Sequence, residues 1–164
     1  VVNEYGVDAL RYFLLRHIHP TEDSDFTMEV FAESYNAHLV NGIGNLVARV
    51  MKLAETYLDA PIQRPEPSEF PEEYRTAFDS FAFNTALEYI WKLIQELDQR
   101  LSTEEPFKVV KTDRDAGIRM ITQAVTDVYT IARLLAPIMP HTSETIKAAV
   151  LANKKPENLF PRKA

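Results

Sequence analysis

The chain has 164 residues, of which 46% are hydrophobic and 26% are charged, and it contains no cysteine. This length and composition predict one compact domain or two small ones, and they exclude a disordered or collagen-like chain. Without cysteine the chain can form no disulfide and no thiolate metal site, which favours a cytosolic compartment. No apolar run approaches the roughly 20 residues that span a bilayer, so we expect no membrane partner.

The formal net charge of −6 is unevenly distributed along the chain. Residues 1–80 carry 6 basic and 14 acidic side chains, whereas residues 81–164 carry 12 and 10. The acidic total argues against nonspecific nucleic-acid binding, because affinity for phosphates comes from lysine and arginine. We expect any polyanion partner to approach the second half, although charge alone favours a solvated C-terminal tail.

Apolar residues at three- and four-residue spacing predict helices along the whole chain, beginning with residues 7–16. After a polar loop, a long amphipathic rod is predicted, with Thr27 as its N-cap and its end at Asp59. Gly42 and Gly44 lie in the middle of this rod, where each costs about 1 kcal/mol relative to alanine. We therefore expect both glycines to be required by close packing.

The four prolines between positions 61 and 71 predict an extended surface linker after the rod. The helices predicted beyond this linker cover residues 71–101, 106–111, 113–136 and 142–151. The first has Phe81 on its buried face, and the tail is expected to be extended, with Leu159 and Phe160 as packing anchors. No strand periodicity or fixed repeat is present, so the predicted fold class is all-α, an antiparallel helix bundle.

No residue pattern predicts a catalytic or metal site. The sequence contains no glycine-rich phosphate loop, no GxSxG motif and no HExxH motif. Its four histidines lack the spacing of metal ligands, and the acidic residues Glu22, Asp23 and Asp25 lack the glycine and terminal glutamate of a calcium loop. We therefore expect no catalytic residue and no metal ligand in this chain.

One polar face of the rod has the chemistry of a base-reading surface. Asn41, Asn45, Arg49 and Lys52 are spaced by four, four and three residues, so they share a face. An amide offers both a donor and an acceptor to a base, and a guanidinium offers a planar fork that bonds or stacks. Spacing alone still favours the ordinary solvated face of an amphipathic helix.

A second candidate element is the aromatic residue Phe107, which follows Pro106 and is flanked by Lys108 and Lys111. Exposed aromatic rings beside positive charge hold single-stranded RNA by stacking on unpaired bases. A core phenylalanine under a loop is the alternative, and the sequence alone favours it.

Several short segments, taken in chain order, resemble class I aminoacyl-tRNA synthetases. Residues 5–16 read YGVDALRYFLLR and are similar to the segment just downstream of the KMSKS loop in these enzymes. The segments that resemble the methionyl-tRNA synthetase family are DSDF at 23–26, YNAHL at 35–39, GNLVARV at 44–50, FNTALE at 83–88, Pro106-Phe107 with Lys111, LAPIMPH at 135–141 and LFPR at 159–162. They keep the family's order and cover nearly the whole chain.

The resemblance implies that residues 27–164 are a helical anticodon-binding domain and that residues 1–26 are a stem-contact segment downstream of the absent KMSKS loop. In this family an Asn-x-x-x-Arg pair, here Asn45 and Arg49, contacts bases of the CAU anticodon. An aromatic residue after proline stacks on the anticodon; it is usually tryptophan, and Phe107 offers a smaller ring. The other residues of the implied anticodon site are Asn41, Lys52, Pro106, Lys108 and Lys111.

The resemblance also implies the activity of a whole enzyme, the ATP-dependent attachment of methionine to tRNA(Met) in cytoplasmic protein synthesis. In the family a Rossmann-type domain with HIGH and KMSKS motifs performs this chemistry, and neither motif is present in this sequence. We therefore expect a piece of a longer protein, with no cofactor of its own and inactive alone. ATP and Mg are implied for the parent methionine–tRNA ligase, and its partners are the tRNA(Met) anticodon loop and the missing catalytic domain.

Two other classes of function stay open at this point. The anticodon-binding domain of a cysteinyl, leucyl or isoleucyl synthetase would keep the opening segment and the bundle. It should not combine Gly44-Asn45-Leu46 and Arg49 with a proline–aromatic turn. A helical protein-interaction module is the other alternative, and it would not bind RNA.

Overall fold

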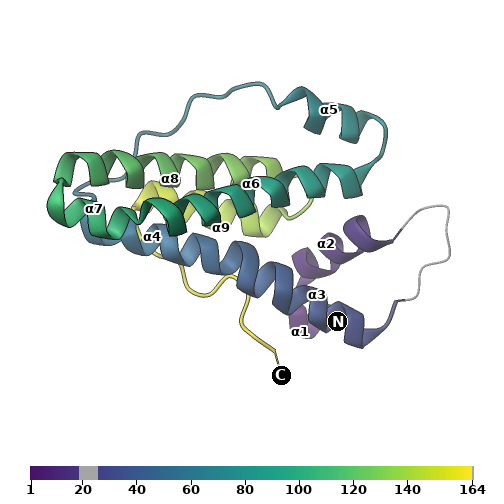
Figure 1. The fold of residues 1–164 in the computed structure, drawn as a ribbon. Helices are drawn as coiled ribbons and strands as arrows, with labels where there is room; N and C mark the ends of the chain where they lie inside the picture. Colours follow the sequence, from purple (N-terminus) through teal and green to yellow (C-terminus); the bar gives the residue numbers. More distant parts are fainter. Residues whose placement is uncertain (19–25, 164) are drawn as a thin grey trace.

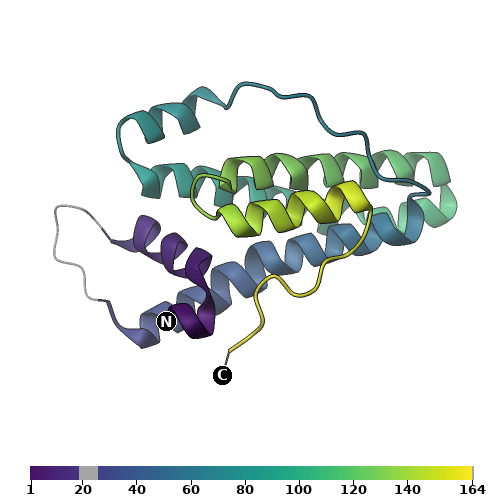
Figure 2. The same ribbon diagram turned by 180° about the vertical axis from the view of Figure 1, so that it is seen from behind.

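The computed structural model describes residues 1–18 and 26–163. The acidic segment considered as a calcium loop lies outside these residues. The helices of the described residues are α1 (Val2–Tyr5), α2 (Val7–His17), α3 (Met28–Ser34), the π-helix η1 (Tyr35–Gly44), α4 (Asn45–Tyr57), α5 (Glu72–Asp79), α6 (Phe83–Glu104), α7 (Pro106–Thr112), α8 (Arg114–Leu135) and α9 (Pro140–Ala152). No strand occurs in the part of the chain that the structure describes, and the long helices α4, α6, α8 and α9 pack side by side (Figures 1 and 2). The predicted all-α helix bundle is confirmed.

The predicted rod consists of three helices joined end to end, with a π-helix in the middle. The Thr27 hydroxyl accepts a hydrogen bond from the Val30 backbone N–H at 3.2 Å, which confirms the predicted N-cap. A Cβ on Gly44 would lie 2.8 Å from the Leu39 carbonyl oxygen, so the π-helix requires glycine there. A Cβ on Gly42 would meet nothing closer than 3.7 Å, so close packing does not explain this second glycine.

The helix predicted over residues 71–101 is wrong, because it is divided in two at Phe81. This residue has a left-handed backbone with φ of 59° and is 75% exposed, not buried. The next backbone N–H, that of Ala82, donates to the Ala77 carbonyl at 2.8 Å, which closes the end of α5 in a Schellman turn. Glycine usually occupies the left-handed position of this turn, so phenylalanine gave no sign of a helix end. The second helix, α6, then continues past the predicted end at residue 101 and ends at Glu104, so the predicted interruption is confined to Glu105.

The proline-rich linker has no regular structure, as predicted, and it runs across the bundle between α4 and α5 (Figure 1). Two arginine side chains fasten it. Arg64 of the linker donates to the Tyr129 hydroxyl at 3.1 Å, and Arg133 of α8 donates to the Ser68 carbonyl at 2.8 Å. The segment is therefore extended but anchored to α8 at two points.

Side-chain hydrogen bonds attach α2 to the rest of the molecule. The Asp8 carboxylate accepts bonds from the Thr142 backbone N–H at 2.6 Å and from its hydroxyl at 2.8 Å, at the start of α9. On the other side, the Tyr12 hydroxyl lies 2.9 Å from Nδ1 of His38, within η1. The Ser34 hydroxyl bonds to the same Nδ1 at 3.2 Å. The N-terminal segment is thus joined to both α9 and the rod.

Stability should depend on pH because of His38 in this junction. Burial lowers its pKa from 6.5 to about 4, and the positive charges of Arg16 and His17 add to the effect. The ring is neutral in the fold, whereas in the unfolded chain it takes up a proton below pH 6.5. The stabilisation is therefore present above that pH and is lost as the pH falls toward 4. Urea unfolding at a series of pH values should show a falling free energy of unfolding on acidification, and less so in His38→Gln. An equal fall in His38→Gln and in the control His141→Gln, an exposed histidine, would contradict this assignment.

Candidate nucleic-acid interface

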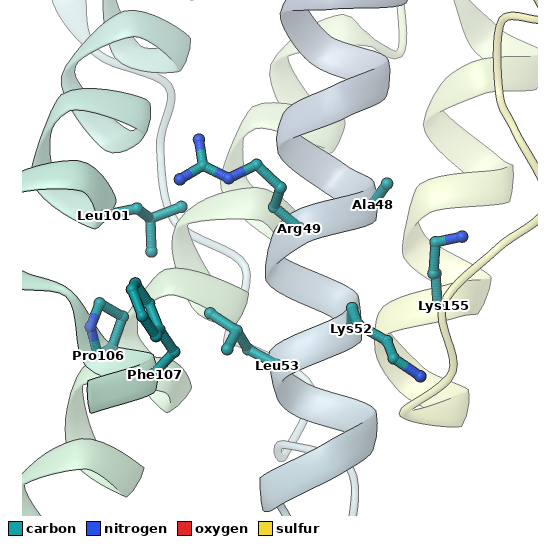
Figure 3. Close-up of a pocket in the computed structure, with 8 residues that line it drawn as sticks. All are labelled: Ala48, Arg49, Lys52, Leu53, Leu101, Pro106, Phe107 and Lys155. Atoms are coloured by element: carbon teal, nitrogen blue, oxygen red, sulfur yellow. The ribbon is translucent and has the colours of Figure 1, made fainter. Parts of the chain in front are cut away.

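A cavity of about 510 Å³ opens on the exposed face of α4, and four of the eight predicted site residues line it (Figure 3). The residues that line it are Ala48, Arg49, Lys52, Leu53, Leu101, Pro106, Phe107 and Lys155. Helix α4 forms its floor, α7 supplies the aromatic side, and the C-terminal tail supplies Lys155. Arg49 and Lys52 are thus brought next to Phe107, more than fifty positions away in sequence.

The ring of Phe107 is presented at the surface by the turn before α7. Glu105 has a left-handed backbone with φ of 46°, and the buried Pro106 then starts the helix. Phe107 is 40% exposed, so it is not the core residue that the sequence alone favoured. The Lys108 ammonium lies 5.7 Å from its ring centroid and pairs with Glu105 at 2.7 Å. Lys111 is exposed but does not line this cavity.

The guanidinium of Arg49 is held by an ion pair with Asp98 of α6. Both side chains are partly accessible, at 38% for Arg49 and 47% for Asp98. One terminal nitrogen makes this contact, and arginine has five N–H donors, so the others are available to a ligand. In Figure 3 the side chain extends from α4 toward α6, beside Leu101. The carboxylate therefore restricts the orientation of Arg49 at the edge of the cavity.

The two asparagines line a second, smaller cavity of about 230 Å³. Its lining consists of Val40, Asn41, Gly44, Asn45, Ala48, Asn158, Leu159, Phe160 and Arg162. Ala48 belongs to both linings, so the two cavities adjoin along the rod. Asn45 is exposed, while the Asn41 carbonyl oxygen accepts a hydrogen bond of 2.6 Å from Arg162. The polar face predicted from spacing therefore lies open at the surface along two connected cavities.

The C-terminal tail, predicted from its charge to be a solvated segment, contributes residues to both cavities. It is docked by the Tyr35 hydroxyl, which donates to the Pro161 carbonyl at 2.9 Å, and by Asn153, which donates to the Leu58 carbonyl at 3.0 Å. Phe160 is 7% exposed, which confirms it as an anchor. The predicted anchors and the cluster of basic residues in the tail were the sequence signals for this arrangement, whereas nothing in the sequence pointed to Asp98.

No group of three or more histidine, cysteine, aspartate or glutamate residues among positions 1–18 and 26–163 could hold a metal ion. Within the same residues, no helix combines the length and the apolar character needed to cross a membrane. The chemistry of the two cavities suits planar, hydrogen-bonding ligands, because an exposed ring, three amides and two guanidinium groups line them.

Comparison with known proteins identifies the family. Residues 1–51 match the model of class I (M) tRNA synthetases, and residues 67–161 match the anticodon-binding domain of tRNA ligases. The chain is 31% identical over 162 residues to the methionine–tRNA ligase of Clostridium acetobutylicum and 32% identical over 161 residues to that of Mycobacterium leprae. It belongs to the methionyl-tRNA synthetase family. The resemblance seen in the sequence is confirmed.

Solved structures of methionyl-tRNA synthetase have the same fold. The free enzyme of Mycobacterium tuberculosis matches with a TM-score of 0.81 at 26% identity, over 99% of this chain and 40% of that one. The same enzyme in complex with methionyl-adenylate matches with a TM-score of 0.74 at 25% identity, over 99% of this chain and 38% of that one. The two curated relatives cover 90% and 87% of this chain, which spans only 25% and 30% of their lengths. Within the methionyl-tRNA synthetase family, this chain contains the anticodon-binding domain.

Proposed function

We propose that this chain recognises the CAU anticodon of tRNA(Met) and so supports the attachment of methionine by a methionyl-tRNA synthetase. The observation that carries this proposal is the convergence of Asn45, Arg49 and Phe107 on two adjoining cavities of one exposed face. An unpaired base can stack on the ring while its edge meets amide and guanidinium donors, which is how proteins read single-stranded RNA loops.

The surroundings of the site favour binding of a single-stranded loop with unpaired bases, and not of a duplex. The larger cavity, at about 510 Å³, is within the size range that encloses small planar ligands. Asp98 keeps Arg49 in one orientation, which reduces the ordering that binding has to impose. An overall acidic chain is compatible with this function because stacking and hydrogen bonds to a few bases need only a local basic neighbourhood.

The other parts of the chain receive roles from the same proposal. Residues 1–26 contact the tRNA stem, and residues 27–164 carry the anticodon site. A catalytic domain of the same enzyme would be the second partner of this chain, and ATP and Mg²⁺ would act in that domain. We assign no residue described here to ATP or Mg²⁺. The function is exercised in the cytoplasm, where aminoacyl-tRNAs are used.

A fluorescence anisotropy titration tests the proposal with the 164-residue chain and a labelled CAU stem-loop. Three further stem-loops each carry one changed anticodon base. We expect each change to weaken binding by about 10-fold or more, because each leaves hydrogen-bonding groups of the site without partners. Preference for the anticodon of a cysteine, leucine or isoleucine tRNA would indicate another class I synthetase, and no binding at low salt would favour a protein-interaction module.

A further inference from the structure

The positive charges around the two cavities differ in whether a carboxylate neutralises them. Arg49 is paired with Asp98, and Lys108 is paired with Glu105. Lys52, Lys155 and Arg162 also line the cavities, and no ion pair among the described residues involves them. The uncompensated charge of this surface therefore comes from one position on α4 and two on the tail.

The tail cations have defined positions in the fold because hydrogen bonds dock the backbone of the tail on the rod. The Glu55 carboxylate accepts a hydrogen bond of 3.2 Å from the Lys155 backbone N–H, which leaves the Lys155 side chain to line the larger cavity. Arg162 is oriented by its bond to the neutral amide of Asn41 and keeps its full charge. Both tail cations are thus positioned by contacts with the rod.

The ring of Phe107 and the cationic side chains of Lys155 and Lys52 lie on opposite sides of α4, which forms the floor of the cavity. In Figure 3, Phe107 lies on one side of α4, whereas Lys155 lies on the other and Lys52 points the same way. A nucleotide has a planar base at one end and a phosphate at the other, joined by the sugar. With its base on Phe107, its backbone would run toward the tail.

We propose that Lys155 and Arg162 of the C-terminal tail, together with Lys52, bind backbone phosphates of the anticodon loop. This inference rests on the proposed function and adds to it a phosphate-binding edge distinct from the base-reading residues. Phosphate contacts position a nucleic acid without reading its sequence. The tail therefore sets affinity and register, and the Asn45–Arg49 face sets the choice of anticodon.

The salt dependence of stem-loop binding tests this division of roles. Anisotropy titrations over a range of salt concentrations give the slope of log Kd against log salt for the unaltered chain and for Lys155→Ala with Arg162→Ala. Each lost phosphate contact reduces the slope by about 0.7 for single-stranded RNA, so the double variant should lose about 1.4. Its preference for CAU over single-base variants should stay unchanged.

Two further variants separate charge from structure. Lys154→Ala removes a neighbouring exposed lysine that lines neither cavity, and it should leave the slope unchanged. Arg162→Lys keeps the positive charge but removes the guanidinium that donates to Asn41. This variant should keep the salt dependence of the unaltered chain. A loss of about 0.7 in Lys154→Ala, the same loss for each charge removed, would overturn the assignment, because general charge would then explain it.

The outcomes distinguish this inference from the function on which it rests. An unaltered slope in the double variant of Lys155→Ala with Arg162→Ala, with CAU preference retained, would overturn the phosphate-binding edge alone. Absence of CAU preference in the unaltered chain would overturn the proposed function itself. Loss of CAU preference in the double variant at constant slope would also overturn the inference, because the tail would then read bases.

Discussion

Alanine at both Arg49 and Phe107 is expected to weaken binding of the CAU stem-loop by on the order of 100-fold or more. Base stacking on an aromatic ring contributes about 1–3 kcal/mol, and a good bidentate contact to a base edge contributes a similar amount. Even the lower ends of these ranges combine to more than a 10-fold loss. Anisotropy titration of the double variant against the unaltered chain measures the effect.

Three companion variants show whether the loss comes from contacts with RNA. Removing Arg49 leaves the Asp98 carboxylate unpaired beside the cavity, so Arg49→Ala with Asp98→Ala distinguishes the missing guanidinium from the exposed negative charge. Arg100→Ala is the matched control, because Arg100 of α6 pairs with Asp127 of α8 and lines neither cavity. Phe107→Trp enlarges the stacking surface and should tighten binding. Unchanged binding by the Arg49 and Phe107 double variant would remove both residues from the site.

Gly117→Ala should lower the free energy of unfolding by about 3 kcal/mol, because there is no space for a methyl group between α7 and α8. A Cβ at this position would lie 2.3 Å from the Cα of Val110, which is backbone and cannot rotate away. The gain in helix propensity from glycine to alanine is only about 1 kcal/mol and does not offset the clash. Urea unfolding curves provide the measurement.

Gly42→Ala is the matched control for this substitution. Both glycines lie within helices, but a Cβ on Gly42 would meet only atoms at 3.7 Å or more, an ordinary contact distance. Its stability should stay within about 1 kcal/mol of the unaltered chain. If Gly117→Ala were equally stable, the close contact of α7 with α8 would be refuted. Because α7 carries Phe107, the Gly117 variant should also bind the stem-loop less well, without any RNA contact of its own.

The helices could be predicted because each buries one apolar stripe, which leaves a periodic pattern in the sequence. The breaks between helices could be predicted only where a specific residue marks them, as Thr27 does at the start of the rod. Phe81 adopts a left-handed backbone that its side chain does not favour, so its residue type does not reveal the turn. The π-helix could not be predicted either, because the spacing of its apolar residues is close to that of an α-helix.

The candidate site was predictable where its residues lie close together in sequence. Asn41, Asn45 and Arg49 share a face by helical spacing. Phe107 was a candidate because it follows Pro106 beside two lysines, and the family resemblance strengthened that prediction. Asp98 and the cationic residues of the tail meet this face only through the fold, since 49 positions separate Arg49 from Asp98 and 121 separate Asn41 from Arg162. Contacts over such distances leave no periodic signal in a single sequence.

The docked tail forms part of both cavities and has fewer buried contacts than the helices of the bundle. Its residues reach the rod through single hydrogen bonds, the partly buried Leu159 and one buried ring, Phe160, whereas α4, α6 and α8 contribute many buried residues to the core. Segments with few buried contacts detach at a lower free energy than the core unfolds. The wall formed by Lys155 and Arg162 can therefore open while the bundle stays intact, and amide hydrogens of the tail should exchange with solvent long before those of α4.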